Sequence, residues 1–207
     1  MKKYIVEFIG TFFLVFTVGC TVIAPGAGDM APVAIGASLM VMVFAGGHIS
    51  GGHFNPAVTF AVWLRGKCES RDVLPYWIAQ IAAAATAAWL MSFFKAPGSA
   101  HELVIYPKAA AAAEFIFTFA LAWVVLNTAT AKGTTGNHFY GVAIGMTVMV
   151  GAYAVGGVSG GAFNPAVATG MTLMGLSHWS NFWVYLVGEL GGAGTAAIIF
   201  KLVNGHD

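Results

Sequence analysis

The sequence predicts an all-α membrane protein with six transmembrane helices and two re-entrant half-helices, arranged as an inverted repeat. Three observations lead to this fold class. Only 8% of the 207 residues are charged and 58% are hydrophobic, whereas a soluble domain carries about 25% charged residues. Six apolar stretches are long enough, or nearly so, to cross a bilayer. The phrase S-G-G-x-F-N-P-A-V occurs once in each half of the chain, at residues 50–58 and 159–167.

The composition also excludes several classes of function. The formal net charge is +1, which gives no reason to expect a nucleic-acid partner. No nucleophile–base pattern or metal-ligand spacing indicates an enzyme, a cofactor or a metal site. We expect Cys20 and Cys68 to be separate, inert thiols. The apolar stretch after Met1 is too long for the core of a signal peptide and contains Glu7, so we expect it to be a permanent span.

The predicted spans are the stretches of roughly 20 apolar residues that a bilayer requires. The second and the fifth are short and rich in glycine, and each leads into one copy of the repeated phrase. The apolar pieces after the two copies, residues 57–64 and 166–176, are too short to cross a membrane. The six spans cover approximately residues 4–24, 32–47, 73–94, 109–129, 139–157 and 179–203.

Each copy of the phrase predicts the start of a short helix inside the membrane. Asparagine is a favoured N-cap, and proline is favoured in the first turn because its missing N–H would be unpaired there. The preceding Ser-Gly-Gly suits a sharp turn, and such backbone is tolerated at membrane depth only within protein or along a water-filled cavity. The two tripeptides are Asn55, Pro56 and Ala57 in the first half, and Asn164, Pro165 and Ala166 in the second.

The repeat extends beyond these phrases. Glu7 and Glu114 begin similar apolar segments, and Gln80 and Glu189 follow their asparagines at equal spacing. We expect one domain over residues 1–207, with a first repeat at about 1–98 and a second at about 107–207. Each repeat contains three spans, so the second must insert with the opposite orientation.

The basic residues predict the orientation in the membrane, because lysine and arginine concentrate on the cytoplasmic side. A cytoplasmic N-terminus places seven of the nine basic residues inside, which also puts the C-terminus there. We expect a multi-pass protein of the plasma (inner) membrane. The seven are Lys2, Lys3, Arg65, Lys67, Arg71, Lys132 and Lys201, and the other two are Lys95 and Lys108.

In this arrangement the N-termini of both half-helices meet near the bilayer centre. Each N-terminus carries roughly half a positive charge, and Asn55 and Asn164 add amide donors. A water held there by its oxygen could not relay a proton, and the positive potential would repel cations. We also expect backbone carbonyls of residues 47–52 and 156–161 to accept hydrogen bonds along the path. The alternative is a pair of ordinary helix caps buried in protein.

Six spans, an inverted repeat and two Asn-Pro-Ala half-helices resemble the aquaporin (major intrinsic protein) family over essentially the whole chain. The resemblance implies a passive channel in the lipid bilayer, with water and small neutral solutes as its partners. It also implies a homotetramer with one pore in each subunit.

The chain departs from the family pattern at the outer selectivity filter. The family positions correspond to Ile35, Ala152, Gly161 and Val167, where water-selective members are similar in having Phe, His, a small residue and Arg. We therefore predict a wide, apolar, uncharged filter that passes the glycerol, urea, ammonia and metalloid-hydroxide class. Two alternatives are a strictly water-selective channel and a filter narrowed by Tyr153 in place of Ala152.

Several polar residues lie within the predicted membrane region. The resemblance implies that Glu7 and Glu114 are structural acceptors for loop N–H groups, and that His48 and His53 hold the first half-helix. Proton transfer by the glutamates and gating by protonation of His48 are the alternatives. Related proteins usually have proline at the position of Glu189, to which we assign no role.

A proton-coupled or ion-coupled transporter is the competing function, because such proteins also use inverted repeats and broken helices. The intramembrane glutamates favour it. The absence of an intramembrane basic or aspartate partner in the predicted spans argues against it.

Overall fold

The computed structural model describes residues 1–205, and these contain eight α-helices joined by loops and short turns. They form two sets of four in chain order, and the described residues contain no strand. A π-helical turn, Leu126–Thr130, continues the fifth helix. The first set is α1 (Lys2–Val22), α2 (Ala31–Ser50), α3 (Pro56–Leu64) and α4 (Ser70–Phe94); the second is α5 (Pro107–Val125), α6 (Tyr140–Ser159), α7 (Pro165–Leu173) and α8 (Phe182–Asn204).

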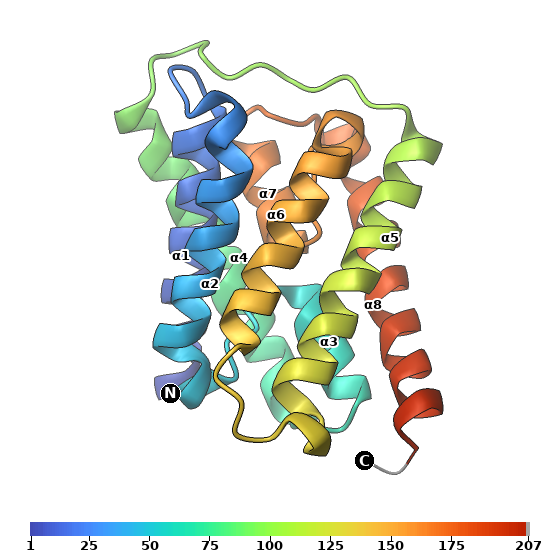
Figure 1. The fold of residues 1–207 in the computed structure, drawn as a ribbon. Coiled ribbons are helices and arrows are strands. Elements are labelled where there is room, and N and C mark those ends of the chain that lie inside the picture. The colour runs from blue at the N-terminus through green and yellow to red at the C-terminus, as the bar shows by residue number, and fades with distance from the viewer. Residues whose placement is uncertain (206–207) are drawn as a thin grey trace.

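The predicted fold class is confirmed. Within the described residues, six helices are long and apolar enough to cross a membrane, and α3 and α7, with nine residues each, are too short. Helix α1 begins and helix α8 ends on one face of the molecule, which we call the terminal face; the opposite one is the distal face (Figure 1). Figure 1 shows α3 in the half next to the terminal face and α7 in the half next to the distal face.

The helices α2 and α6 run further than the sequence predicts. They end at Ser50 and Ser159 rather than at residues 47 and 157, because the glycines before those positions continue the helix. Each helix stops where the next residue adopts left-handed backbone, with φ of 91° at Gly51 and 92° at Gly160. Glycine reaches that conformation without a steric penalty, which makes it a common helix terminator.

The two sets are joined through the close packing of α2 on α6. A Cβ atom on Gly36 would lie 2.6 Å from the Gly145 carbonyl oxygen, and one on Gly145 would lie 2.4 Å from that of Gly36. Small residues allow membrane helices to approach backbone to backbone. These two glycines occupy equivalent places in the repeat, so the approach is nearly symmetric.

Candidate functional site

Both asparagines cap the short helices that follow them. The Oδ1 atom of Asn55 accepts hydrogen bonds from the backbone N–H groups of Ala57 at 2.8 Å and Val58 at 3.3 Å. Asn164 Oδ1 accepts from Ala166 N at 2.9 Å. Such caps satisfy N–H groups that have no partner within the helix. Each amide oxygen is therefore used within its own half of the chain.

The amide nitrogens reach across to the other half. Asn55 Nδ2 donates to the Phe163 carbonyl at 2.8 Å, and Asn164 Nδ2 donates to the Phe54 carbonyl at 2.9 Å. Both phenylalanines have left-handed backbone, with φ of 47° at Phe54 and 49° at Phe163. This conformation costs about 1–3 kcal/mol at each non-glycine residue. The exchange brings the starts of α3 and α7 together.

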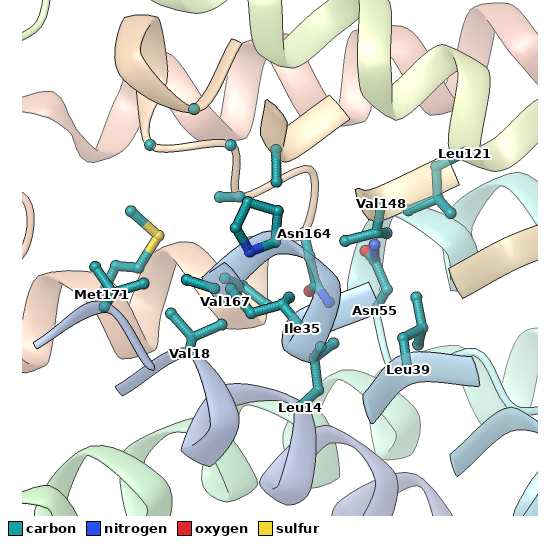
Figure 2. A pocket seen from close by; sticks show the side chains of 18 of the residues that line it. Leu14, Val18, Ile35, Leu39, Asn55, Leu121, Val148, Asn164, Val167 and Met171 are labelled. Carbon is teal, nitrogen blue, oxygen red and sulfur yellow. The ribbon is translucent and has the colours of Figure 1, made fainter. Parts of the chain in front are cut away.

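A cavity of about 450 Å³ has both amides in its wall. Each amide nitrogen carries two N–H groups and spends one on the opposite phenylalanine carbonyl, which leaves the other for the cavity. Figure 2 shows Asn55 and Asn164 close together among apolar side chains. The convergence of two helix N-termini makes this place electropositive.

The rest of the wall is mostly apolar and follows the repeat. Equivalent positions of the two halves face the same cavity, so the lining is similar on either side of the asparagines. The sequence could have indicated this symmetric lining, since Leu14 and Leu121 follow Glu7 and Glu114 at equal spacing. The five apolar pairs in the lining are Leu14 with Leu121, Val18 with Val125, Ile35 with Ile144, Leu39 with Val148, and Val58 with Val167.

The structure places the four residues assigned to the outer filter in the cavity wall: Ile35, Ala152, Gly161 and Val167. Tyr153 takes a different direction, and its hydroxyl donates to the Asp29 carbonyl at 2.8 Å. The filter positions present no charged side chain.

Sequence reasoning missed the contribution of the loop over the distal face. His101 and Glu102, in the connection between α4 and α5, also border the cavity. Figure 1 shows this connection crossing the distal face of the molecule. Nothing local in the sequence indicates that it bends back over the cavity, because the approach depends on how the helices pack.

Glu7 is buried and ties the first Ser-Gly-Gly turn to α1. Its Oε1 accepts from Ser50 Oγ at 2.7 Å and His53 N at 3.0 Å, and its Oε2 accepts from Phe54 N at 2.6 Å and Gln80 Nε2 at 2.8 Å. The carboxylate thus holds the backbone that precedes Asn55. Each hydrogen bond to a charged group contributes about 1.5–3 kcal/mol.

Glu114 repeats this arrangement in the second half. Its Oε1 accepts from Ser159 Oγ at 2.7 Å and Ala162 N at 3.1 Å, and its Oε2 accepts from Phe163 N at 2.7 Å. Glu189 lies beside it on α8, and its Oε1 accepts from Asn164 N at 2.9 Å. The glutamates therefore bond to the backbone that shapes the two turns.

The two histidines have different surroundings. His53 is buried, its Nδ1 lies 3.1 Å from Thr59 Oγ1, and its ring packs 5.2 Å from that of Tyr76. It borders both the main cavity and a second one of about 450 Å³ near the terminal face. His48 is exposed on the last turn of α2 and is not among the residues that line either cavity.

The second cavity has a more polar wall. Lys3, Cys68 and Asp72 contribute to it, and the Lys3 ammonium pairs with the Asp72 carboxylate. His53 and Val125 line both cavities and mark the place where they adjoin. A polar vestibule at the terminal face therefore leads toward the apolar cavity.

The expectation about backbone carbonyls was partly wrong. The carbonyls of Gly47 and Gly156 accept from Gly51 N and Gly160 N within the longer helices. Those of Ser50 and Ser159 accept from the hydroxyls of Tyr76 and Tyr185. Of the residues in the two stretches, Gly52 in the first and Gly156, Gly160 and Gly161 in the second line the main cavity.

Comparison with known proteins agrees with this geometry. The sequence profile of the family described as major intrinsic protein matches residues 1–200. The chain is 36% identical to aquaporin NIP1-4 of Oryza sativa subsp. japonica over 99% of this chain and 77% of that protein. It is 35% identical to glycerol uptake facilitator protein-like 6 of Lactiplantibacillus plantarum over the full length of both.

A solved structure supports the fold. The X-ray structure of the aquaglyceroporin from Plasmodium falciparum matches with a TM-score of 0.79, covering 98% of this chain and 96% of that one at 21% identity. From the paired half-helices, the cavity between them and the match over nearly the whole sequence, we conclude that this chain belongs to the major intrinsic protein family of membrane proteins.

Proposed function

We propose that the protein is a passive channel for water and small uncharged solutes, and that it excludes protons and ions at the paired Asn-Pro-Ala motifs. The observation that carries the proposal is the meeting of two capped half-helices, with Asn55 and Asn164 in the wall of one cavity. Related proteins named as aquaporins and as a glycerol uptake facilitator support it. Members of this family are channels, and the protein is not an enzyme.

Ion exclusion follows from the electrostatics of the centre. Two helix N-termini, each worth roughly half a positive charge, face the same short segment of cavity. The remaining N–H of each asparagine would hold a passing water by its oxygen and orient its hydrogens away from the centre. That water cannot accept a proton from its neighbour, and a cation loses its hydration without gaining an acceptor.

The solute class follows from the distal end of the cavity. The proposed filter, Ile35, Ala152, Gly161 and Val167, offers neither the positive charge of an arginine nor the bulk of aromatic rings. A wide, apolar opening admits neutral molecules larger than water and gives little compensation for the lost hydration of an ion. Small neutral solutes such as glycerol, urea, ammonia or metalloid hydroxides fit this description.

The test is stopped-flow light scattering of proteoliposomes with water and a panel of neutral solutes. We expect fast osmotic shrinkage, solute re-entry that is linear in concentration, and rates above those of protein-free liposomes. Water flux with exclusion of every larger solute would instead support the strictly water-selective alternative. Saturable flux driven by a pH gradient would support a coupled transporter. The glutamates argue against proton coupling, because all three accept hydrogen bonds from backbone N–H groups.

Topology and assembly complete the proposal. The protein is a multi-pass membrane protein, and we place both termini in the cytoplasm and the channel in the plasma (inner) membrane. The family membership supports a homotetramer with one pore in each subunit. The mass of the purified protein in a charge-neutral detergent, corrected for bound detergent, tests the oligomeric state.

A further inference from the structure

Glu189 breaks the symmetry of the repeat at a buried position. Its counterpart in the first half is Gln80, which occupies the same spacing from its asparagine. Both side chains are fully buried. Gln80 can donate a hydrogen bond through its amide, whereas an ionised Glu189 can only accept. The second half thus replaces a neutral donor by a carboxyl group.

The buried glutamate of the second half has one hydrogen-bond donor fewer than its counterpart in the first half. Glu7 accepts four hydrogen bonds, the fourth from Gln80 Nε2 to Oε2 at 2.8 Å. Glu114 accepts the equivalent three from Ser159 Oγ, Ala162 N and Phe163 N. The repeat places the Glu189 carboxyl where the fourth donor stands in the first half. Helix α8 packs against Glu114 at this level, since a Cβ on Gly188 would lie 2.9 Å from Glu114 Cβ.

The atoms of Glu189 show which oxygen is involved. Oε1 accepts from the backbone N–H of Asn164 at 2.9 Å. Oε2 is buried and receives no N–H or hydroxyl donor from the residues that the structure describes. Two carboxyl oxygens can bond to each other only if one of them carries a proton.

We propose that Glu189 is an uncharged carboxylic acid whose hydroxyl donates to Glu114, and that it acts as a positioning residue for the second half-helix. In this form it performs the task of Gln80 and, through its other oxygen, holds the N–H of Asn164. Two carboxylates that share a buried site retain one proton for the same electrostatic reason. The groups bonded to the pair are neutral, and Tyr185, the nearby ionisable group on α8, is engaged with the Ser159 carbonyl and Ser177.

The proton matters for ion exclusion. A second negative charge beside the start of α7 would offset the positive end of that helix and attract cations to the centre. With Glu189 neutral, each half of the chain has one buried carboxylate at the same place. The positive potential at the centre is then similar on both sides. The proposal concerns the charge and position of the barrier, so it holds for any neutral permeant.

Infrared spectroscopy of the full-length protein, in a detergent without ester groups at about pH 8, tests the charge directly. Exposed carboxyls are ionised at that pH, so we expect a carboxylic-acid carbonyl band that is lost in Glu189→Gln. The matched control is Gln80→Glu, which recreates the pair in the first half and should add a second band of this kind. Absence of the band in the unmodified protein, or its survival in Glu189→Gln, would overturn the proposal.

Ion leakage gives a second readout in proteoliposomes. Glu189→Gln keeps the donor to Glu114 and the acceptor for Asn164, so we expect cation leakage and water flux within about twofold of the unmodified channel. Glu189→Leu removes both and should raise cation leakage relative to water flux. A clear fall in cation leakage in Glu189→Gln would mean that Glu189 is charged, and equal behaviour of the Leu and Gln variants would exclude a positioning role. The infrared result does not depend on which solutes pass, so it separates this proposal from the proposed function.

Discussion

Asn55 and Asn164 each combine three tasks in one side chain. The amide oxygen caps a half-helix, one N–H bonds to the opposite half, and the second N–H remains for the cavity. Only a carboxamide has the acceptor and two donors that these tasks require. An aspartate would keep the helix cap and lose both N–H donors. Substitution by aspartate therefore tests the donors without removing the cap.

The variant Asn164→Asp should therefore fold and leak cations. The change removes the hydrogen bond to the Phe54 carbonyl and places a negative charge where two positive helix ends meet. We expect proton and sodium flux to rise about tenfold, equivalent to ~1.4 kcal/mol in the barrier, measured with a pH-sensitive dye and a sodium indicator in proteoliposomes. Asn181→Asp, the same change before α8 and away from the cavity lining, is the control. Unchanged ion flux in Asn164→Asp would count against the proposed central barrier.

A second residue-scale prediction concerns the width of the distal opening. Val167 is 4% exposed and lies in the cavity wall. The variant Val167→Arg should lower glycerol and urea flux by about tenfold or more, because a long charged side chain narrows the opening at a cost of ~1.4 kcal/mol or more to larger solutes. Water flux should fall less. Val167→Leu adds bulk without charge and is the comparison; solute selectivity that stays the same in the Arg variant would remove Val167 from the filter.

At the scale of helices, the geometry of the centre depends on how far α2 and α6 run. Each continues through its glycines to a serine, whose hydroxyl donates to the buried glutamate of its own half. The left-handed glycines then reverse the chain, and the following asparagine starts the half-helix. A helix that stopped earlier would move the serine away from the glutamate and leave the turn without this support.

The packing of α2 on α6 gives a prediction at the same scale. In Gly145→Ala the new methyl group would lie 2.4 Å from the Gly36 carbonyl oxygen, so the two helices must separate. We expect a loss of roughly 1–3 kcal/mol, typical of overpacking, seen as a lower unfolding temperature in detergent. Gly157→Ala lies on the same helix with open space around its Cβ and should be neutral or stabilising by up to ~1 kcal/mol. Equal melting of both variants would show that the close approach does not limit stability.

At the scale of the whole molecule, the cysteines report the proposed orientation. Cys68 lies between α3 and α4 beside the second cavity, whereas Cys20 lies near the C-terminal end of α1. In a Cys20→Ser background, a membrane-impermeant maleimide should label Cys68 in inside-out vesicles and leave it unlabelled in right-side-out vesicles. Labelling only in right-side-out vesicles would reverse the topology, with the basic terminal face outside.

The same reaction should depend on pH in a defined way. Burial is the main cause that raises the pKa of the Cys68 thiol, and the negative charge of Asp72 adds to it. The thiolate is the reactive form, so labelling should accelerate with rising pH over a range above that of a free model thiol. The pH profile of the labelling rate, with glutathione as the reference, checks this. A profile that coincides with glutathione would mean that the thiol is solvated.

The architecture of this protein follows from the order of its residues alone. Low charge and six apolar stretches require a membrane fold, and the two Asn-Pro-Ala phrases locate the half-helices because proline and asparagine have strong preferences at helix starts. The half-helices can be inferred because short-range preferences and the repeat can be read along the chain. The assignment of Ile35, Ala152, Gly161 and Val167 to the expected filter needed the resemblance to the aquaporin family, whose positions were counted from the same phrases.

The packing of the helices in three dimensions selects which groups meet across the chain. The exchange between each asparagine and the opposite phenylalanine carbonyl, the approach of His101 and Glu102 over the cavity, and the hydrogen bond from Asn164 N to Glu189 all join residues that are distant in sequence. Spacing along the amino-acid sequence carries no information about such pairs. Their hydrogen bonds form because helix packing brings the partners within reach, and burial then makes an unpaired polar group too costly to leave unsatisfied.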